Sequence, residues 1–430
     1  MEKAKFPACS LGSVIHEIRY GTGTPPPYLE PGSETVPFVR ATDIKDGEVN
    51  LETLYHIAEE QPKLMDKCRL AGGELIIVRS GVNTGDCAVI PPVLSGAYAA
   101  YDLILTFTAA ASAHFVSTFL DTEIGRLQLN LVKGRAAQPH INAEEVSALR
   151  VPLPKPTKQA ELVAAMDAAR AQRRAKLAEA DALLAGLDGF LLATLGLTPP
   201  PKDDRKVFAA RRADVPARFD PHFHLPALAQ NTRMLTAGGA EPLGSLVSFS
   251  GEIWKPAKHE KPTFRYIEIS NVNPNTGEAR AEETPVAEAP SRARMAVRTN
   301  DIIVSLTRPH HGSIAQITSD LNGCVASTGF SVLRGIEGSR LNREYLWCVL
   351  RSKMCLLQML QRASGGNYPA ITEPELAKVL LPVPKPAVQE TIATEARRRR
   401  EAARRLRAEA EAGWQAAKRW FEEQLLGAVK

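Results

Sequence analysis

The sequence VPLPKPTKQ at residues 151–159 returns, with five of its nine positions identical, as LPVPKPAVQ at residues 381–389. A long segment rich in alanine and charged residues follows both copies. Proline fixes φ at about −65° and lacks the N–H that a helix interior needs, so alternating prolines form a stiff, extended connector. Pro156 is well placed as the first residue of a helix. The stretch therefore predicts a connector that leads into a long helix, twice in one chain.

The repetition continues on the N-terminal side of both connectors. Residues 230 positions apart coincide there, as Gln128 and Gln358 do. Further upstream the offset is 227, as a short insertion would produce, and GELIIVRSGVNTGDCAVI (73–90) aligns with NDIIVSLTRPHHGSIAQI (300–317). An internal repeat of this length predicts two copies of one structural plan.

Each copy of the plan is expected to be a mixed α/β unit. Short runs such as ELIIV (74–78) and DIIVS (301–305) are bounded by glycine and asparagine, which is typical of strands separated by loops. Residues 114–132 and 344–362 show apolar side chains at helical spacing. We predict an α+β protein with two tandem mixed α/β domains, each followed by a long helix. The predicted boundaries are 1–150 for the first domain, 151–197 for its connector and helix, 198–215 for a linker, 216–380 for the second domain, and 381–430 for its connector and helix.

Both long segments place apolar or small residues at steps of three and four, which is the spacing of a coiled-coil seam. A helix with so narrow an apolar face is not stable alone, so two of them in one chain are expected to bury their seams against each other. We predict that they pair as an antiparallel coiled coil. The seam residues are Leu162, Met166, Leu177, Leu184 and Leu191 in the first helix, and Ile392, Ala396, Ala403, Leu406 and Trp414 in the second.

Composition sets broad limits on the class of protein. With 44% hydrophobic and 23% charged residues, a chain of 430 residues is expected to form two or three soluble domains. No apolar stretch is long enough to cross a bilayer and no signal-peptide core is present, so a cytoplasmic location without a membrane partner is expected. Six scattered cysteines without a C-x-x-C pair argue against a zinc site and a disulfide framework. The net charge of +5 permits a nucleic-acid partner without requiring one.

Through its connectors the chain resembles the DNA specificity subunits of type I restriction-modification systems, and the resemblance covers nearly the whole chain. The family pattern is a target-recognition domain, a connector of the form PLPPLxEQ and a helix, followed by a second copy of all three. Here the connectors read PLPKPTKQ and PVPKPAVQ, with Lys158 and Val388 where the family has glutamate. RFDPHFHLP (218–226) also looks like the R-x-D segment that opens the second half in this family.

The resemblance implies a DNA-binding protein with no catalytic residues and no cofactor of its own. It would read an asymmetric target in double-stranded DNA, one half-site per recognition domain. Its helices would dock two methyltransferase subunits, which would supply S-adenosylmethionine binding and adenine flipping. Endonuclease and translocase subunits would join them to make the restriction complex.

Two loops in each domain carry the side chains that DNA reading needs. Base edges are read by forked donors and acceptors, and phosphates are bound by basic side chains and backbone N–H groups on loops. The family places DNA contacts in loops of this general kind. In the first domain the candidates are Arg79, Ser80, Asn83, Thr84, Lys133, Arg135, Gln138 and His140. In the second they are Thr307, Arg308, His310, His311, Ser364, Asn367 and Tyr368, and a third set comprises Arg19, Tyr20, Trp254 and Lys255.

Three other interpretations of the sequence are a metal site, an amino-methyltransferase and a nucleic-acid-binding adaptor. The adjacent His310 and His311 could suggest a metal, but no third ligand lies near them in sequence, so none is expected. DPHF (220–223) resembles the D-P-P-[YF] signature of amino-methyltransferases, but His222 replaces the second proline and no glycine-rich turn for S-adenosylmethionine accompanies it. A two-headed nucleic-acid-binding adaptor outside restriction-modification is the remaining alternative. Binding of methyltransferase subunits to the helices discriminates it from the specificity-subunit interpretation.

Overall fold

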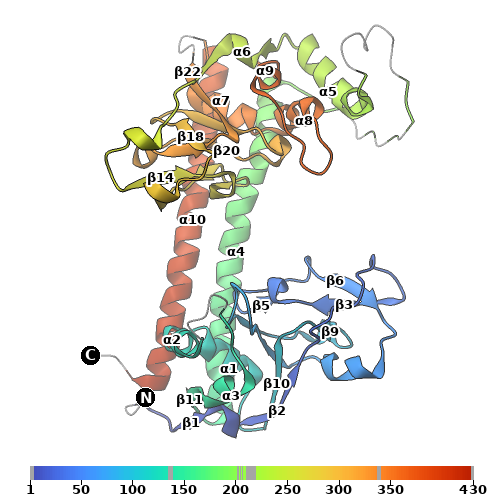
Figure 1. Ribbon diagram of the computed structural model, residues 1–430, viewed down its shortest axis with the longest axis vertical. Coiled ribbons are helices and arrows are strands. Elements are labelled where there is room, and N and C mark those ends of the chain that lie inside the picture. The colour runs from blue at the N-terminus through green and yellow to red at the C-terminus, as the bar shows by residue number, and fades with distance from the viewer. Residues whose placement is uncertain are drawn as a thin grey trace. The chain divides into compact units, whose positions relative to one another are not determined.

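The computed structural model describes residues 4–133, 139–200, 203, 205, 207–209, 219–336 and 340–427. Its contacts divide the chain into two compact units. Unit 1 comprises Met1–Lys176 and Ala408–Lys430, and unit 2 comprises Leu177–Arg407. Within the predicted linker 198–215, residues 201, 202, 204, 206 and 210–215 lie outside the described residues. Each unit contains a globular head together with parts of both long helices (Figure 1).

Unit 1 is built on a four-stranded antiparallel sheet. Its order is β2 (Ile15–Tyr20), β10 (Leu103–Phe107), β7 (Leu75–Ile77) and β8 (Cys87–Val89). A second sheet has the order β6 (Tyr55–Ala58), β3 (Thr35–Val39) and β9 (Tyr98–Ala99), and two ribbons pair β1 (Ala8–Ser10) with β11 (Arg150–Pro152) and β4 (Ile44–Lys45) with β5 (Glu48–Val49). The helices are α1 (Ala113–Leu120), α2 (Glu123–Val132), α3 (Ala143–Ala148) and the long α4 (Pro156–Leu195), with 3-10 turns at Leu11–Ser13, Ala41–Asp43, Lys63–Cys68 and Pro92–Leu94.

Unit 2 has the same order in its main sheet and one additional strand, β18, in its second sheet. Its main sheet runs β13 (Val247–Phe249), β22 (Phe330–Ile336), β19 (Ile302–Ser305) and β20 (Ile314–Gln316), and its second sheet runs β17 (Glu282–Pro285), β14 (Thr263–Ile267), β21 (Val325–Ser327) and β18 (Ala293–Ala296). The ribbons are β12 (Glu241–Pro242) with β23 (Leu380–Leu381) and β15 (Val272–Asn273) with β16 (Glu278–Ala279). The helices are α5 (Pro226–Ala237), α6 (Leu243–Leu246), α7 (Arg343–Leu350), α8 (Lys353–Arg362), α9 (Glu373–Leu376) and the long α10 (Pro386–Leu426). Six 3-10 turns complete the elements of this unit among its described residues, at Pro221–His224, Pro256–Lys258, Ile269–Asn271, Val286–Glu288, Pro309–His311 and Ser319–Leu321.

The elements of the two units repeat at the offsets that the sequence gives. Helices α7, α8 and α10 begin 230 residues after α1, α2 and α4, and β19 and β20 begin 227 residues after β7 and β8. The predicted fold class, two mixed α/β domains each followed by a long helix, is confirmed.

The two long helices pair in antiparallel fashion inside each unit. In unit 1 the beginning of α4 packs with the end of α10, where Leu162 shares a core with Trp414 and Phe421. In unit 2 the end of α4 packs with the beginning of α10, where Leu191 shares a core with Ile392. Seven predicted seam residues are buried, namely Leu162, Met166, Leu191, Ile392, Ala396, Ala403 and Trp414. The other three, Leu177, Leu184 and Leu406, are partly exposed.

The glutamine that ends each proline connector joins three parts of its unit. Gln159 donates to the carbonyls of Ala110 (2.7 Å) and Pro154 (2.8 Å), and its Oε1 accepts the N–H of Ser112 at 2.9 Å. Gln389 repeats all three bonds at the residues 230 positions later, each at 2.8 Å. Both side chains belong to residues that are 1% exposed, so the bonds are shielded from water. The connector, the start of the long helix and the turn before α1 or α7 are thereby fixed to one another.

Replacing Gln159 by alanine is expected to lower the free energy of unfolding by about 2–3 kcal/mol, because buried backbone groups lose their partner. Urea denaturation of the purified chain, followed by circular dichroism, measures the change. The matched control is Lys158→Ala, at a side chain 32% exposed, which should change stability by less than about 0.5 kcal/mol. Equal effects of the two substitutions would contradict the structural role of the glutamine.

Candidate nucleic-acid interface

The structure brings the two predicted loops of each head together. We define the first loop as residues 79–85 in unit 1 and 306–312 in unit 2, and the second loop as residues 133–140 and 363–370. In unit 1, Ser80 and His140 form an antiparallel bridge, and the N–H of Ile141 donates to the carbonyl of Arg79 at 2.9 Å. Thr307 and Ala370 form the same bridge in unit 2, where the N–H of Ile371 donates to the carbonyl of Leu306 at 2.8 Å. The same backbone bonds therefore join two loops of different sequence.

Each first loop ends at a glycine with a left-handed backbone. Gly85 has a φ of 89° and Gly312 a φ of 80°, a conformation that residues with a Cβ rarely adopt. The four positions before them read GVNT in unit 1 and RPHH in unit 2. The geometry at the loop base is thus the same, while the side chains on the loop differ.

In unit 1, several predicted contact residues are engaged inside the head. Arg79 is 8% exposed, and its guanidinium lies over the rings of Tyr20 (4.8 Å) and Tyr101 (4.2 Å). Its Nη2 donates to Nε2 of His140, on the second loop, at 2.5 Å. Thr84 is buried and donates to the carbonyl of Gly81 at 2.6 Å and to that of Pro139, in the second loop, at 3.2 Å. Arg79 and Thr84 therefore tie the two loops together in this structure.

The remaining predicted residues of unit 1 lie at or near the surface. His140 is exposed, and Ser80, Asn83 and Lys133 are half-buried. Arg135 and Gln138 lie outside the described residues. Burial, together with the charge of Arg126, lowers the pKa of the Lys133 ammonium.

Unit 2 presents its candidates more openly. Arg308 has a left-handed backbone (φ 46°), and its guanidinium lies 4.3 Å from the ring centroid of Tyr368. Tyr368 is 71% exposed, and its neighbour Asn367 is exposed as well. A non-glycine residue held at positive φ is uncommon, and Asp46 and Asn300 are the other two among the described residues. Arg308 and Tyr368 therefore form a cation and aromatic pair at the tip of the joined loops.

The other candidates of unit 2 have varied surroundings. His311 and Ser364 are exposed, while Thr307 is half-buried beside the bridge to Ala370. His310 is half-buried, and its Nδ1 has no hydrogen-bond partner among the described residues. Burial, with the nearby His311 and Arg308, lowers the pKa of the His310 imidazole. The uncharged form of His310 is therefore favoured.

Three residues of the third predicted set serve packing. Arg19 donates to the carbonyls of Lys67 and Arg69, at 3.2 and 3.1 Å, and pairs with Glu74. Tyr20 lies beneath Arg79, and Trp254 stacks on Phe264 with ring centroids 4.4 Å apart. Lys255 is exposed.

Tyr101 and Asp102 are site residues that the sequence did not reveal. Tyr101 covers Arg79 and is 45% exposed, and Asp102 is buried and accepts the N–H of Arg79 at 3.2 Å. They follow strand β9 in a segment without a recognisable motif, and the aligned positions in unit 2 are Thr328 and Gly329. Only their position beside the first loop identifies them.

The motifs that suggested other chemistry form ordinary turns. Asp220 of DPHF accepts the N–H of His222 at 3.0 Å and so caps a 3-10 turn, and the carbonyl of Phe223 accepts a bond from Gln361. Among the described residues, no group of three or more His, Cys, Asp or Glu could hold a metal ion. All six cysteines are free thiols. In the part of the chain that is described, no helix combines the length and the apolar character that a membrane span needs.

Asp102 gives the first head a pH dependence. Burial raises the pKa of its carboxyl to about 6 from 3.8, although the backbone N–H and the charge of Arg79 oppose the rise. The unfolded chain releases this proton at lower pH than the folded chain does, so the contribution of Asp102 to stability falls as the pH rises from about 4 to about 6.

The substitution Asp102→Asn is expected to remove this loss while keeping an acceptor for Arg79. The free energy of unfolding of the variant, relative to the unmodified chain, should rise by about 2–3 kcal/mol between pH 4 and pH 7. Denaturant titrations at a series of pH values provide the measurement. Asp66→Asn, at an exposed carboxyl, is the control and should show a constant difference. If the difference in free energy of unfolding between Asp102→Asn and the unmodified chain also stays constant with pH, the raised pKa of Asp102 is contradicted.

Comparisons with known proteins give two relatives that bear on this fold. The specificity subunit of the type I restriction enzyme HindI from Haemophilus influenzae is 27% identical over 131 residues, which are 30% of this chain and 25% of that subunit. The chain thus spans about a quarter of the curated relative that it matches. A chain from a solved type I restriction-modification system, studied for complex assembly and conformational transition, matches 98% of this chain and 97% of its own at 18% identity, with a TM-score of 0.50.

A crystal structure of the specificity subunit from Thermoanaerobacter tengcongensis aligns with 99% of this chain and 97% of its own at 18% identity. Its TM-score of 0.37 is too low to support a structural argument. No protein-family model matches the chain.

These findings define the class as a two-headed protein in which each mixed α/β head is followed by a long helix that pairs with the other. The curated match and the full-length match in fold confirm the resemblance that the connectors carry. The chain is similar to the specificity subunits of type I restriction-modification systems in its connectors and over part of its sequence, and its fold matches a chain of such a system.

Proposed function

We propose that this chain reads a two-part DNA target for a type I restriction-modification complex, one half-site per head. The observation that carries the proposal is the pair of joined loops in each head. Identical backbone bonds hold the loops, while the side chains on them differ, for example Arg308 and Tyr368 in unit 2 against Gly81 and the partly buried Asn83 in unit 1. One scaffold with two sets of side chains is what reading two different half-sites requires.

The proposed partners are those that the resemblance to specificity subunits implies. The paired helices α4 and α10 would dock two methyltransferase subunits, and endonuclease and translocase subunits would complete the restriction complex. S-adenosylmethionine would be held by the methyltransferase subunits. The chain itself would contribute DNA binding and no catalytic group.

Mapping adenine methylation tests the proposal. The chain is co-expressed with the methyltransferase encoded beside it, and methylated adenines are located across a genome by single-molecule sequencing. A split asymmetric motif is expected, and exchanging one head should change one half of that motif only. A chain that binds no methyltransferase subunit would instead support a nucleic-acid-binding adaptor outside restriction-modification.

The substitution Arg308→Ala is expected to weaken DNA binding about tenfold or more, because one good base contact contributes about 1–3 kcal/mol. Fluorescence anisotropy of the complex with a duplex carrying the mapped target measures the affinity. The loss should disappear when the half-site of unit 2 is already scrambled. Arg292→Ala, at an exposed arginine of unit 2 outside both loops, is the control and should leave the affinity unchanged. Equal losses for both arginines would indicate nonspecific attraction to phosphates.

A further inference from the structure

The turn between the two short helices of each head contacts both the first loop and a long helix. In unit 1 this turn separates α1 from α2, and in unit 2 it separates α7 from α8. The long helix that it contacts belongs to the other half of the chain: α10 in unit 1 and α4 in unit 2. Each head is therefore in contact with the long helix that follows the other head in the sequence.

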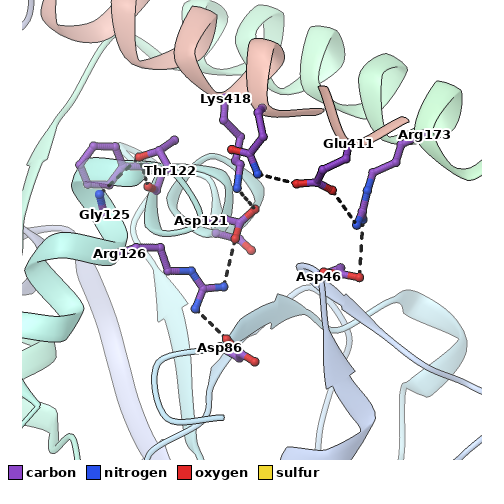
Figure 2. A network of polar contacts seen from close by, with 12 residues as sticks. Asp46, Asp86, Asp121, Thr122, Gly125, Arg126, Arg173, Glu411 and Lys418 are labelled. Carbon is purple, nitrogen blue, oxygen red and sulfur yellow. Dashed lines mark hydrogen bonds and ion pairs between the residues drawn. The ribbon is translucent and has the colours of Figure 1, made fainter. Parts of the chain in front are cut away.

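In unit 1 the contact with α10 is made by a carboxylate. Oε1 of Glu422 accepts the N–H of Ile124 at 2.7 Å, at the beginning of α2. An acidic group at this end of a helix satisfies a free N–H and interacts favourably with the helix dipole. Lys418, one turn earlier on α10, lies 4.0 Å from Asp121 in the same turn (Figure 2). The beginning of α2 is thereby anchored to α10.

From α2, one arginine reaches the end of the first loop. Nη1 of Arg126 donates to Oδ1 of Asp86 at 2.6 Å and to the carbonyl of Gly85 at 3.3 Å, while its Nη2 donates to Asp121 at 3.0 Å. Figure 2 shows the guanidinium between the two carboxylates. Asp86 also closes the loop through its backbone, since its N–H donates to Asn83 and its carbonyl accepts from Val78. A continuous chain of polar contacts thus runs from α10 through α2 to the first loop.

Unit 2 makes the same connection with different residues. Oδ1 of Asp188, on α4, accepts the N–H of Lys353 at the beginning of α8 at 2.9 Å. Arg351, in the same turn, donates through Nη1 to the carbonyl of Gly312 at 3.0 Å and to that of Ile314 at 3.2 Å. Gly312 is the counterpart of Gly85. In both heads, therefore, an arginine holds the carbonyl of the glycine that ends the first loop, although the two arginines come from different positions of the repeat.

We propose that the first loop of each head is positioned from the long helix of the other half, through Glu422 and Arg126 in unit 1 and through Asp188 and Arg351 in unit 2. The inference rests on the proposed function, since it concerns the loops that would read DNA. It goes beyond that function by assigning positioning residues for head 1 to the C-terminal end of the chain. Because coupling between two sites is reciprocal, DNA bound at a first loop would also alter the helix pair to which partner subunits dock.

Hydrogen exchange on the full chain without DNA is the first test. Glu422→Ala is expected to speed exchange about tenfold at residues 79–86 and to leave residues 305–314 unchanged. Asp188→Ala is expected to do the reverse. Glu422→Gln keeps an acceptor and should stay close to the unmodified chain. Glu423→Ala on α10 and Glu179→Ala on α4, at exposed carboxylates of the same two helices, are controls that should change neither loop. Unfolding of one head alone would speed exchange throughout that head, so the central strand of the affected head, β10 (Leu103–Phe107) or β22 (Phe330–Ile336), must keep the exchange rate of the unmodified chain.

The second measurement is DNA discrimination by the assembled complex. Glu422→Ala is expected to reduce discrimination at the half-site of head 1 about tenfold and to leave that of head 2 intact, with the opposite result for Asp188→Ala. Exchange that rises equally at both loops, or at neither, would overturn the inference even if the complex binds its target normally. If each variant speeds exchange only at the loop expected for it, but the complex binds no DNA, the positioning role is retained and the proposed function is overturned.

Discussion

Reciprocal burial of the two long helices is the constraint on which the rest of the structure depends. In unit 1 the core of the head includes Phe421 and Leu425 of α10, both fully buried, and the ring of Phe421 lies 5.7 Å from that of Phe115 on α1. Burying one such side chain contributes about 1.5–3 kcal/mol, and a domain is stable by only about 5–15 kcal/mol in total. The last turns of α10 therefore supply a large part of what holds the first head together. Unit 2 repeats the arrangement with Leu191 of α4.

This constraint explains the proline connectors. A helix that must complete the core of a distant part of the chain has to leave its own head in a defined direction. The prolines make the exit stiff. Gln159 and Gln389 fix its direction, because each donates hydrogen bonds to a connector carbonyl, that of Pro154 or Pro384, and to the turn before α1 or α7. Within unit 2, Ala180 of α4 and Ala403 of α10 are fully buried, and an ion pair joins Asp181 of α4 to Arg407 of α10, 2.6 Å apart. Exposed pairs of this kind add little stability, so the pairing depends on the apolar seam.

Much of the fold could be predicted from the sequence because its determinants are local or repeated. The prolines, the helical spacing and the two offsets require no tertiary information, and they gave the helices and their pairing. Partial exposure of Leu177, Leu184 and Leu406 could not be read from spacing, because spacing gives the face of the helix on which a side chain lies and not how far its neighbours cover it. Burial becomes complete where a head adds a further layer, as at Leu162.

The candidate site was predictable only in part, for a related reason. Sequence indicates which loops carry donors, and the structure joins those loops. Sequence does not indicate the direction of a side chain, so Arg79 and Thr84 resemble surface donors although both are buried, and Tyr101 has no signal at all. The carbonyls of Gly85 and Gly312 each accept a hydrogen bond from an arginine, and the two arginines do not align in the repeat. Arg126 holds one and Arg351 holds the other, and the residue aligned with Arg351 in unit 1 is Asp121, which carries the opposite charge. Two heads of one chain therefore reach the same backbone geometry through different side chains, and aligning the two halves position by position would miss the residues that share this role.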